Sequence, residues 1–427
     1  MKMTKYKLGE LIEVTRGASL SGQFYAEEGK LIRLTLGNFN MDGGGFKENT
    51  SKTDLYFTGT VRDEFILNKG DIITPLTEQS LGLLGTTARI PESGKYIQSQ
   101  DVALVRCKEG LLDPNFCYYL ISSSIVRQQL SAAAQQTKIR HTSPEKIKNC
   151  TVWVPDFEVQ KNIGRILTDI DNKIAINRRI NDNLEAMAKQ LYDYWFVQFD
   201  FPNEEGKPYK SSGGAMVWNE KLKREIPQGW TAAKIKDVAQ TYSGGTPTST
   251  NSEYYDGGDI PWINSGELNN PIITSTTNYI TEEGLNNSSA KLYPQDTVLV
   301  ALYGATAGKV SLLSFEACSN QAVCGVIPQN KIMTTYIRYY LSSLYEHFIT
   351  LSSGSARDNI SQDTIKNTIL PIPQGKILKE YSYAVAPIIS KIIANQKEME
   401  NLTKQRDELL PLLMNGQATV NYHLSDD

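Results

Sequence analysis

Two long stretches of the chain carry apolar residues at steps of four and three positions. The first stretch has Ile163, Leu167, Ile170, Ile174, Leu184, Leu191 and Trp195. The second stretch has Val385, Ile388, Ile392, Met399, Leu402, Leu409 and Leu413. Steps of this kind form the narrow seam of a coiled coil rather than the wider apolar stripe of an ordinary surface helix. We therefore predict two long helices, over residues 157–197 and 374–415.

The two seams are copies of each other, because six residues of the first have a counterpart 218 residues later. Asn177 and Asn395 are separated by the same interval and lie within the seams. A buried Asn in a seam costs stability but fixes helix register; the alternative is that both Asn side chains lie at the seam edge and contact water. An antiparallel pair would place these two residues face to face. It would also place a globular unit at each end of a rod of roughly 60 Å, at about 1.5 Å per residue.

The globular parts of the chain repeat as well. Asn320–Val323 parallels Ser99–Val102, and Ile365–Asn367 repeats Ile147–Asn149. The fold class predicted is α+β, with two similar α/β domains joined by two long antiparallel coiled-coil helices in a pseudo-twofold internal repeat. We assign residues 1–156 and 227–373 to the domains, 198–226 to a linker and 416–427 to a C-terminal tail. Within the first domain we expect strands at 31–36, 102–106 and 147–155, and one helix at 114–130.

Composition limits the class of protein without deciding its partner. The chain has 427 residues, 40% of them hydrophobic and 21% charged, as expected for a soluble globular protein of two or more domains. No apolar run approaches the roughly 20 residues that span a bilayer, and no signal peptide is recognisable at the start. Five cysteines without paired spacing indicate a reduced, cytoplasmic protein. The net charge of −3 neither indicates nor excludes binding to DNA.

Motifs for catalysis are missing from the sequence. Gly304–Val310 has three residues between its glycines and Val after Lys, whereas a phosphate-binding loop needs four residues and Ser or Thr. The three histidines, His141, His347 and His423, have no metal-ligand spacing with cysteine. We therefore expect a binding protein without a metal or cofactor. Two similar domains on a rod suit duplex DNA, and differences between the domains predict an asymmetric, bipartite target.

An ordered set of motifs carries a family resemblance. The set is Ile226–Trp230, Gly244–Pro247, Ile260–Ile263, Gly304–Gly308, Asn320-Gln321 and Leu370–Pro373. On these motifs and the duplication, the chain resembles the specificity subunit of type I restriction–modification systems over essentially its whole length. The first half departs from the pattern, because it lacks the Ile-Pro-x-Gly-Trp opening and starts at Lys7-Leu8-Gly9-Glu10.

The resemblance implies two target-recognition domains that bind double-stranded DNA, and no catalysis by the chain itself. It implies two methyltransferase (modification) subunits, which use S-adenosylmethionine, and two ATP-dependent restriction/translocase subunits in the restricting complex. A second hypothesis is a scaffold without DNA binding, whose coiled coil joins two protein-interaction domains. A third, a self-contained methyltransferase or nuclease, needs a cofactor site that the sequence does not show.

DNA contact needs Arg or Lys for phosphates and Arg, Asn, Gln, Ser or Thr for base edges. The first domain offers Arg16, Arg33, Asn38, Gln79, Ser80, Lys138 and Arg140. The second offers Thr246, Asn264, Tyr303, Thr306, Lys309 and Arg357. For each, the alternative is a solvated loop residue or a turn former. Tyr192, Trp195 and Phe196, at the end of the first long helix, are either packed in the core or a docking site for a modification subunit.

Overall fold

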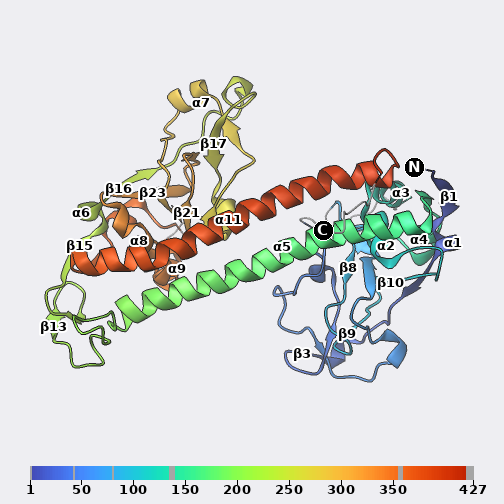
Figure 1. Ribbon diagram of the computed structural model, residues 1–427, viewed down its shortest axis with the longest axis horizontal. Helices are drawn as coiled ribbons and strands as arrows, with labels where there is room; N and C mark the ends of the chain where they lie inside the picture. The colour runs from blue at the N-terminus through green and yellow to red at the C-terminus, as the bar shows by residue number, and fades with distance from the viewer. Residues whose placement is uncertain (1, 42–43, 79–80, 134–139, 354–358, 420–427) are drawn as a thin grey trace, which may run out of the picture. The chain divides into compact units, whose positions relative to one another are not determined.

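The chain forms two compact units, each containing one globular domain and part of both long helices (Figure 1). The structure is a computed structural model that describes residues 2–41, 44–78, 81–133, 140–353 and 359–419. Unit 1 takes in residues 1–175 and 399–427, and unit 2 takes in residues 176–398. Helices α5 (Phe157–Tyr192) and α11 (Gly375–Met414) contribute residues to both units. A π-helical turn, Asp193–Val197, continues α5.

The domain of unit 1 is built on an antiparallel sheet in the order β2–β10–β6–β8. Its strands are β2 (Ile12–Arg16), β10 (Val102–Cys107), β6 (Ile72–Pro75) and β8 (Ala88–Arg89). A second sheet, β3–β5–β4–β9, comprises β3 (Tyr25–Ala26), β5 (Tyr56–Phe57), β4 (Leu31–Arg33) and β9 (Tyr96–Ile97). Strand β4 runs parallel to β9, and Ala18 forms a bridge with Ser99. The segments that follow β2 and β4 therefore meet the same loop, residues 98–101.

Unit 1 differs from the sequence prediction in one helix and one strand. Its helices are α1 (Leu8–Leu11), α2 (Pro114–Ser122), α3 (Ser124–Ala133) and α4 (Pro144–Lys148). The single helix predicted at 114–130 is interrupted at Ser123, which is extended and bonds the carbonyl of Leu120 through both its amide and its hydroxyl. The strand predicted at 147–155 is shorter, β12 (Thr151–Val154), because Ser143 caps α4 before it. β12 pairs with β1 (Thr4–Lys7), and β7 (Thr77–Glu78) pairs with β11 (Arg140–His141).

Unit 2 repeats this plan, as the sequence predicted. Its main sheet runs β16–β23–β20–β21–β18, with β16 (Ala239–Ser243), β23 (Val323–Pro328), β20 (Val298–Ala301), β21 (Val310–Leu313) and β18 (Ile272–Ile273). A smaller sheet contains β19 (Tyr279–Ile280), β17 (Ile260–Ile263) and β22 (Cys318–Ser319), with β17 parallel to β22. β15 (Thr231–Lys234) pairs with β24 (Ile369–Ile372), as β1 pairs with β12. The helices are α6 (Ile235–Val238), α7 (Glu282–Asn286), α8 (Thr334–Ser343), α9 (Tyr345–Ser353) and α10 (Gln362–Asn367).

The segment predicted as a loop-like linker, 198–226, is instead a packed lobe. It contains an antiparallel hairpin, β13 (Met216–Asn219) and β14 (Arg224–Pro227). Phe201 is buried and stacks on Tyr209 and Trp230, with ring centroids 4.7 and 5.4 Å apart. A few aromatic side chains spaced along a polar segment are enough to bury its centre, so glycine and proline content alone gave the wrong prediction.

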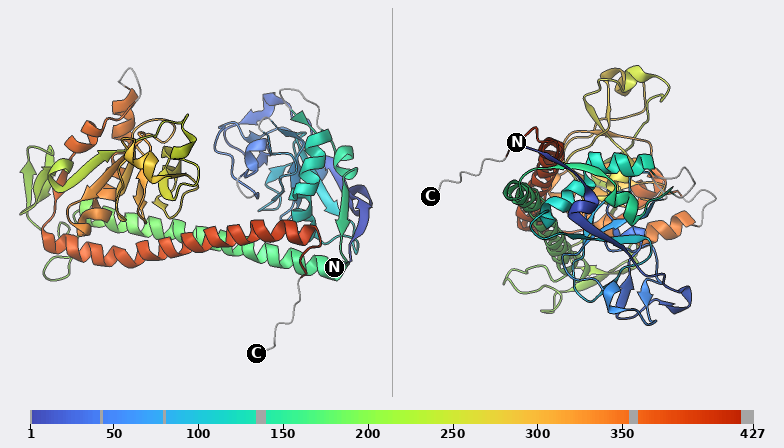
Figure 2. Two further views of the ribbon diagram at one scale, coloured as in Figure 1. Left: turned by 90° about the horizontal axis from the view of Figure 1, so that it is seen from above. Right: turned by 90° about the vertical axis from the view of Figure 1, so that its right-hand side faces the viewer.

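The two helices lie side by side within each unit (Figures 1 and 2). In unit 1, Asp171 of α5 pairs with Arg406 of α11 over 2.9 Å, and Leu167 and Leu413 belong to one core. In unit 2, Asn177 bonds Glu398 and Asn181 bonds Ile392, so residue numbers rise on α5 while they fall on α11. The pairing in unit 2 is therefore antiparallel, as predicted from the seam.

The hydrogen bonds of Asn177 and Asn395 differ from the facing pair that we expected. Both side chains are buried, each with 2% of its surface exposed, rather than in contact with water at the seam edge. Asn395 donates to Asn181 over 2.9 Å, and Asn177 donates to Glu398 over 2.7 Å. The partner of Asn395 thus lies one helical turn beyond Asn177. The role of both residues in fixing register stays a prediction.

Candidate nucleic-acid interface

In unit 1 a close backbone approach joins the end of β2 to the 98–101 loop. A Cβ on Gly17 would overlap the carbonyl oxygens of Gln98 and Ser99, so only glycine fits there. The amide of Ala18 donates to Gln98 O over 2.9 Å. Arg16, predicted as a DNA contact, is exposed, and its Nε donates to the carbonyl of Gln100 over 2.8 Å. Its guanidinium is thus fixed beside the loop with part of its surface open to solvent.

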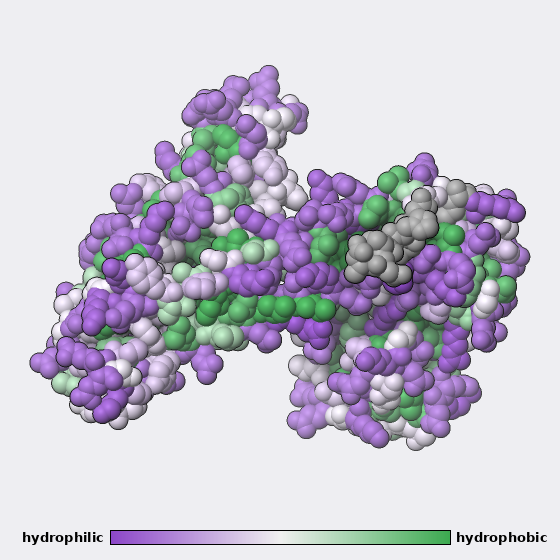
Figure 3. Space-filling view, in the orientation of Figure 1, coloured by the Kyte–Doolittle hydropathy of each residue, from purple (hydrophilic) through white to green (hydrophobic). Residues whose placement is uncertain are grey.

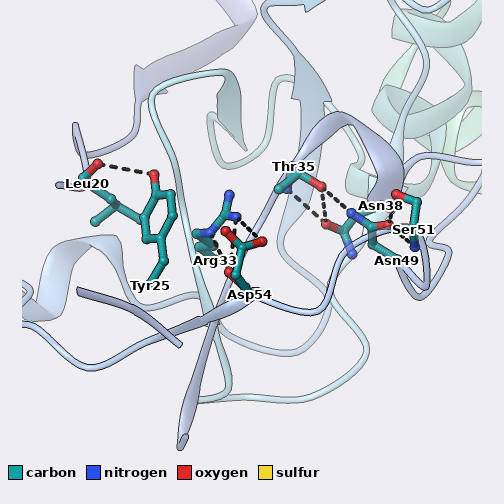
Figure 4. Close-up of polar contacts among 8 residues, drawn as sticks. All are labelled: Leu20, Tyr25, Arg33, Thr35, Asn38, Asn49, Ser51 and Asp54. Carbon is teal, nitrogen blue, oxygen red and sulfur yellow. Dashed lines mark hydrogen bonds and ion pairs between the residues drawn. The ribbon is translucent and has the colours of Figure 1, made fainter. Parts of the chain in front are cut away.

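Arg33, by contrast, is held inside the domain (Figure 4). Its guanidinium lies 3.8 Å from the ring centroid of Tyr25 and 3.1 Å from the carboxylate of Asp54. Its Nη2 also donates to the carbonyl of Asp54 over 3.0 Å, and 7% of the residue is exposed. Arg33 also lines the polar cavity described below, so its contact with a base stays a prediction. The cation holds the β3 and 54–57 segments in place, because a buried guanidinium must be paired and stacked.

Asn38 is also a structural residue. Its Oδ1 accepts from the amide of Thr35 over 2.9 Å, and its Nδ2 donates to the carbonyl of Lys47 over 3.1 Å. The side chain is buried, with 2% exposed, so its predicted contact with DNA is corrected to a capping role. Asn49 then bonds the hydroxyl of Thr35 over 2.8 Å, which ties the 46–51 segment to the end of β4 (Figure 4).

These contacts surround a polar cavity of about 320 Å³. Tyr25, Thr35, Lys52, Ser99 and Gln100 are among the residues that line it. Such hydroxyl, amide and ammonium groups are the ones that contact base edges and phosphates. Thr35, Asn49 and Lys52 were not among the residues predicted from the sequence. Only the fold brings them beside Ser99 and Gln100, and no local sequence pattern indicates them.

Arg140, a further candidate of the first domain, lies in β11 opposite Glu78 of β7. Arg140 pairs with Glu78 at 3.0 Å, and the carboxylate of Glu78 is buried. The predicted direct contact of Arg140 with DNA is thus replaced by an ion pair inside the domain. Gln79, Ser80 and Lys138 lie outside the described residues.

Unit 2 builds the corresponding loops with different side chains. The turn at 320–323 closes through Val323 N to Asn320 O, as the turn at 99–102 closes through Val102 N to Ser99 O. A Cβ on Gly244 would overlap the carbonyl of Asn320, in the way that Gly17 meets Ser99. The two domains therefore share a backbone frame at this site, and the parallel motifs predicted from sequence occupy equivalent turns.

A polar cluster covers this frame in unit 2. The exposed hydroxyl of Thr246 donates to the amide oxygen of Gln321. Burial raises the pKa of Tyr303, whose phenol is hydrogen-bonded to Gln321. Asn264 accepts from Asn320 Nδ2 over 3.1 Å. Three of the predicted residues, Thr246, Asn264 and Tyr303, thus converge on the 320–321 turn, and their side chains carry both hydrogen-bond donors and acceptors.

Lys309 and Thr306, two further candidates of the second domain, do not join this cluster. The side chain of Lys309 donates to Asn269 Oδ1 over 2.6 Å. Thr306 is buried, with 5% exposed, so the predicted contact of its side chain with DNA is corrected to a turn residue whose carbonyl accepts from the amide of Lys309. Arg357 lies outside the described residues.

Over the described ranges, no group of three or more His, Cys, Asp or Glu side chains could hold a metal ion. Within the same ranges, no helix combines the length and the apolar character needed to cross a membrane.

The family follows from a sequence comparison. The model of the family described as type I restriction modification DNA specificity domain matches residues 1–186 and 227–404. The chain belongs to this family.

Relatives within the family match most of the chain. The type I restriction enzyme HindI specificity subunit of Haemophilus influenzae is 26% identical over 377 residues, which cover 75% of this chain and 81% of that protein. The MjaIX specificity subunit of Methanocaldococcus jannaschii is 26% identical over 318 residues, 73% of this chain and 71% of its own length. The solved type I restriction–modification S subunit from M. genitalium has the same fold, with a TM-score of 0.61, 16% identity and coverage of 97% and 96%.

In this specificity-family chain the aromatic end of α5 is core rather than surface. Tyr192, Trp195 and Phe196 are buried, and Phe196 packs edge-on against Tyr336 and Tyr381 with ring centroids 4.7 and 4.8 Å apart. Their predicted role in docking a partner is corrected, because at most 7% of each residue is exposed. The alternative of core packing describes these residues.

Proposed function

We propose that the chain is the DNA-recognition subunit of a type I restriction–modification complex and has no catalytic activity of its own. The observation that carries the proposal is the loop frame built twice, around Gly17 with Ser99 and around Gly244 with Asn320. Membership of the specificity family supports it. Two copies of one frame suit a target with two similar halves, and duplex DNA offers such a target.

The two half-sites of the proposed target differ in sequence, because the two frames carry different side chains. In unit 1 the cavity offers Thr35, Lys52 and Gln100. In unit 2 the cluster offers Thr246, Asn264 and Gln321. Hydrogen-bonding groups in different arrangements select different base edges. The target would therefore be asymmetric and bipartite.

The partners in this proposal are two methyltransferase subunits, which carry S-adenosylmethionine, and two ATP-dependent translocase/nuclease subunits in the restricting complex. The complex would act on chromosomal DNA in the cytoplasm. A second apolar row on α5 supports docking of a partner helix, since Ile176, Ile180 and Met187 follow at steps of four and seven and are 44%, 38% and 55% exposed. Figure 3 shows an apolar band over this part of α5. The row replaces the aromatic end of α5 as the proposed docking surface.

The test uses the full chain assembled with its methylating subunits. We expect salt-dependent retention of the complex on duplex DNA that contains one bipartite sequence. When the gene for the chain is deleted, we expect one set of methylated adenines to disappear from the genome. A scaffold without DNA binding would instead leave the set of methylated sites unchanged when Thr246 or Gln321 is replaced. Methyl transfer by the purified chain alone would contradict the absence of catalysis.

A further inference from the structure

The side-chain amide of Gln321 is held between two hydroxyl groups at the surface of unit 2. Its Oε1 accepts a hydrogen bond from the hydroxyl of Thr246, and its side chain is also hydrogen-bonded to the phenol of Tyr303. Burial raises the pKa of Tyr303, and the hydrogen bond with Gln321 opposes this rise. A hydrogen bond donated to a phenol oxygen has this effect, because it favours the ionised form. The Nε2 of Gln321 is therefore the donor to Tyr303.

The backbone around Gln321 is fixed as well. The amide of Val323 donates to the carbonyl of Asn320 over 3.1 Å and closes the turn that contains Gln321. The amide of Gly244 donates to the carbonyl of Val323 over 2.9 Å, so the segment that leads to Thr246 is tied to the same turn. A side chain on a fixed turn, with its amide held from two sides, loses little freedom when it binds a target.

Two hydrogen-bonding positions of this amide remain open to a ligand. A primary amide has two N–H donors and two lone pairs on its oxygen. Among the described residues, Thr246 takes one lone pair of Gln321 and Tyr303 takes one of its N–H groups. One donor and one acceptor are left, and Gln321 is exposed. Both groups are therefore accessible from outside the domain.

One donor beside one acceptor selects a single base. In the major groove adenine presents N7 as an acceptor and the N6 amino group as a donor. Guanine presents two acceptors, cytosine presents one donor, and thymine presents one acceptor beside a methyl group. Adenine is thus the base that matches a glutamine amide at both positions, through two parallel hydrogen bonds.

The first domain places a glutamine at the equivalent turn but surrounds it differently. Gln100 occupies the position of Gln321 in the 99–102 turn and lines the polar cavity of unit 1. Thr77 stands where unit 2 has Tyr303, each one position after a leucine carbonyl that accepts a backbone amide over 2.8 Å. Thr77 has a short side chain and is buried, with 6% exposed. The arrangement around Gln321 is therefore a property of the second domain.

We propose that Gln321 reads an adenine in the half-site of the second domain. This rests on the proposed function. In the major groove, Nε2 of Gln321 donates to N7 of the base, and Oε1 accepts from the N6 amino group. Thr246 and Tyr303 are positioning residues, because they orient the amide and leave the choice of base to it.

A substitution of equal shape tests the base identity. Gln321→Glu replaces the amide donor by an acceptor, and a carboxylate accepts from the N4 amino group of cytosine. A base-substitution scan with the complex of chain and methylating subunits should show the change at one position of the site. There the preference for adenine should fall by about tenfold to hundredfold, and a preference for cytosine should appear. The other half-site should keep its preference.

The matched control makes the same change of charge elsewhere in the second domain. Gln329 is exposed like Gln321, and the six residues of β23 separate the two glutamines. Gln329→Glu should keep every base preference of the parent complex. Because preference is a ratio between two duplexes, general weakening by the added negative charge cancels.

A change in the DNA gives a second test that leaves the protein unchanged. Replacing the adenine by 7-deazaadenine removes the N7 acceptor and should weaken binding of the parent complex by about tenfold. Gln321→Ala should bind both duplexes equally. Thr246→Val should lose less preference than Q321A and keep adenine as the preferred base, as a positioning role requires.

The outcomes separate this proposal from the proposed function. A preference for adenine that survives in Q321A or Q321E would overturn the assignment, as would a preference lost at a position that holds another base. Equal effects of 7-deazaadenine on the parent complex and on Q321A would do so as well. A parent complex that binds all duplexes alike would reject the proposed function itself.

Discussion

Asn395 donates a hydrogen bond of 2.9 Å to Asn181, and both side chains are buried between α5 and α11 in unit 2. Asn181 in turn donates a hydrogen bond from its Nδ2 to the carbonyl of Ile392 over 3.1 Å. The helix pair therefore contains a polar layer in which each member depends on the other. Layers of this kind are tolerated in a seam when they are fully satisfied, and they favour one register over its neighbours.

Replacing one member of the layer should cost more than replacing both. Asn395→Leu leaves the Oδ1 of Asn181 without its donor and should lower the free energy of unfolding by about 1–3 kcal/mol. The double variant with Leu at both positions should be neutral or more stable, but with a less well fixed register. Urea unfolding of the full chain measures this, with the exposed Asn183→Ala on α5 as the control. A double variant that loses as much as the two single variants together would contradict the pairing.

The two close glycines should act on separate half-sites. Gly17→Ala would force the β2 end away from the 98–101 loop, and Gly244→Ala would do the same at Asn320. In a base-substitution scan of the bound DNA, each variant should weaken the base preference in one half-site. The expected loss is about tenfold where the displacement removes one bidentate contact to a base. Gly266→Ala is the control, because a Cβ there has no neighbour within 4 Å. Identical effects of G17A and G244A on the same half-site would refute the repeated frame.

The packed lobe at 198–226 should weaken in acid through Asp200. Hydrogen bonds from the hydroxyl and the amide of Ser211, over 2.6 and 2.7 Å, hold the pKa of Asp200 below its ordinary value. A carboxyl group whose pKa is lowered in the folded state stabilises the fold at pH values above its ordinary pKa, about 3.9 for Asp. This stabilisation is lost as the pH falls through the pKa of the folded state. Asp200→Asn should therefore lower the melting temperature at pH 7, and the difference from the parent should shrink below about pH 4. A difference that is constant with pH would mean that the charge of Asp200 contributes nothing.

The long helices should set the spacer of the target and leave the half-sites unchanged. Seven residues inserted after Lys173 in α5 and after Leu402 in α11, beside the Asp171–Arg406 pair, preserve the seam and lengthen each helix by about 10 Å. At about 3.4 Å per base pair, the spacer should grow by about three base pairs. Mapping of methylated adenines reads the new target directly. The control replaces the exposed Asn172 and Lys173 by Ala at constant length, and changed half-site sequences would refute this role of the helices.

The helices and the duplication could be predicted from the sequence because their signals are local or repeated. A seam of period 3.5 needs only the order of apolar residues along one helix. Matching motifs such as Ser99–Val102 and Asn320–Val323 need only a comparison of the chain with itself, and the two turns that they form are indeed equivalent. Both signals can be found in the sequence alone, one from the local spacing of apolar residues and the other from the internal repeat.

The roles of single polar and aromatic residues depended on partners that the sequence does not place beside them. Arg33 is paired because the fold brings it to Tyr25 of β3 and to Asp54 in the segment before β5, and Arg140 is paired because Glu78 lies across a strand pair. Phe196 became core because Tyr336 and Tyr381 cover it. The sequence alone determined the two helices, the internal repeat and the family resemblance. The tertiary structure decided which polar groups face inward, since the cost of burying a charge or an amide is met only by long-range contacts.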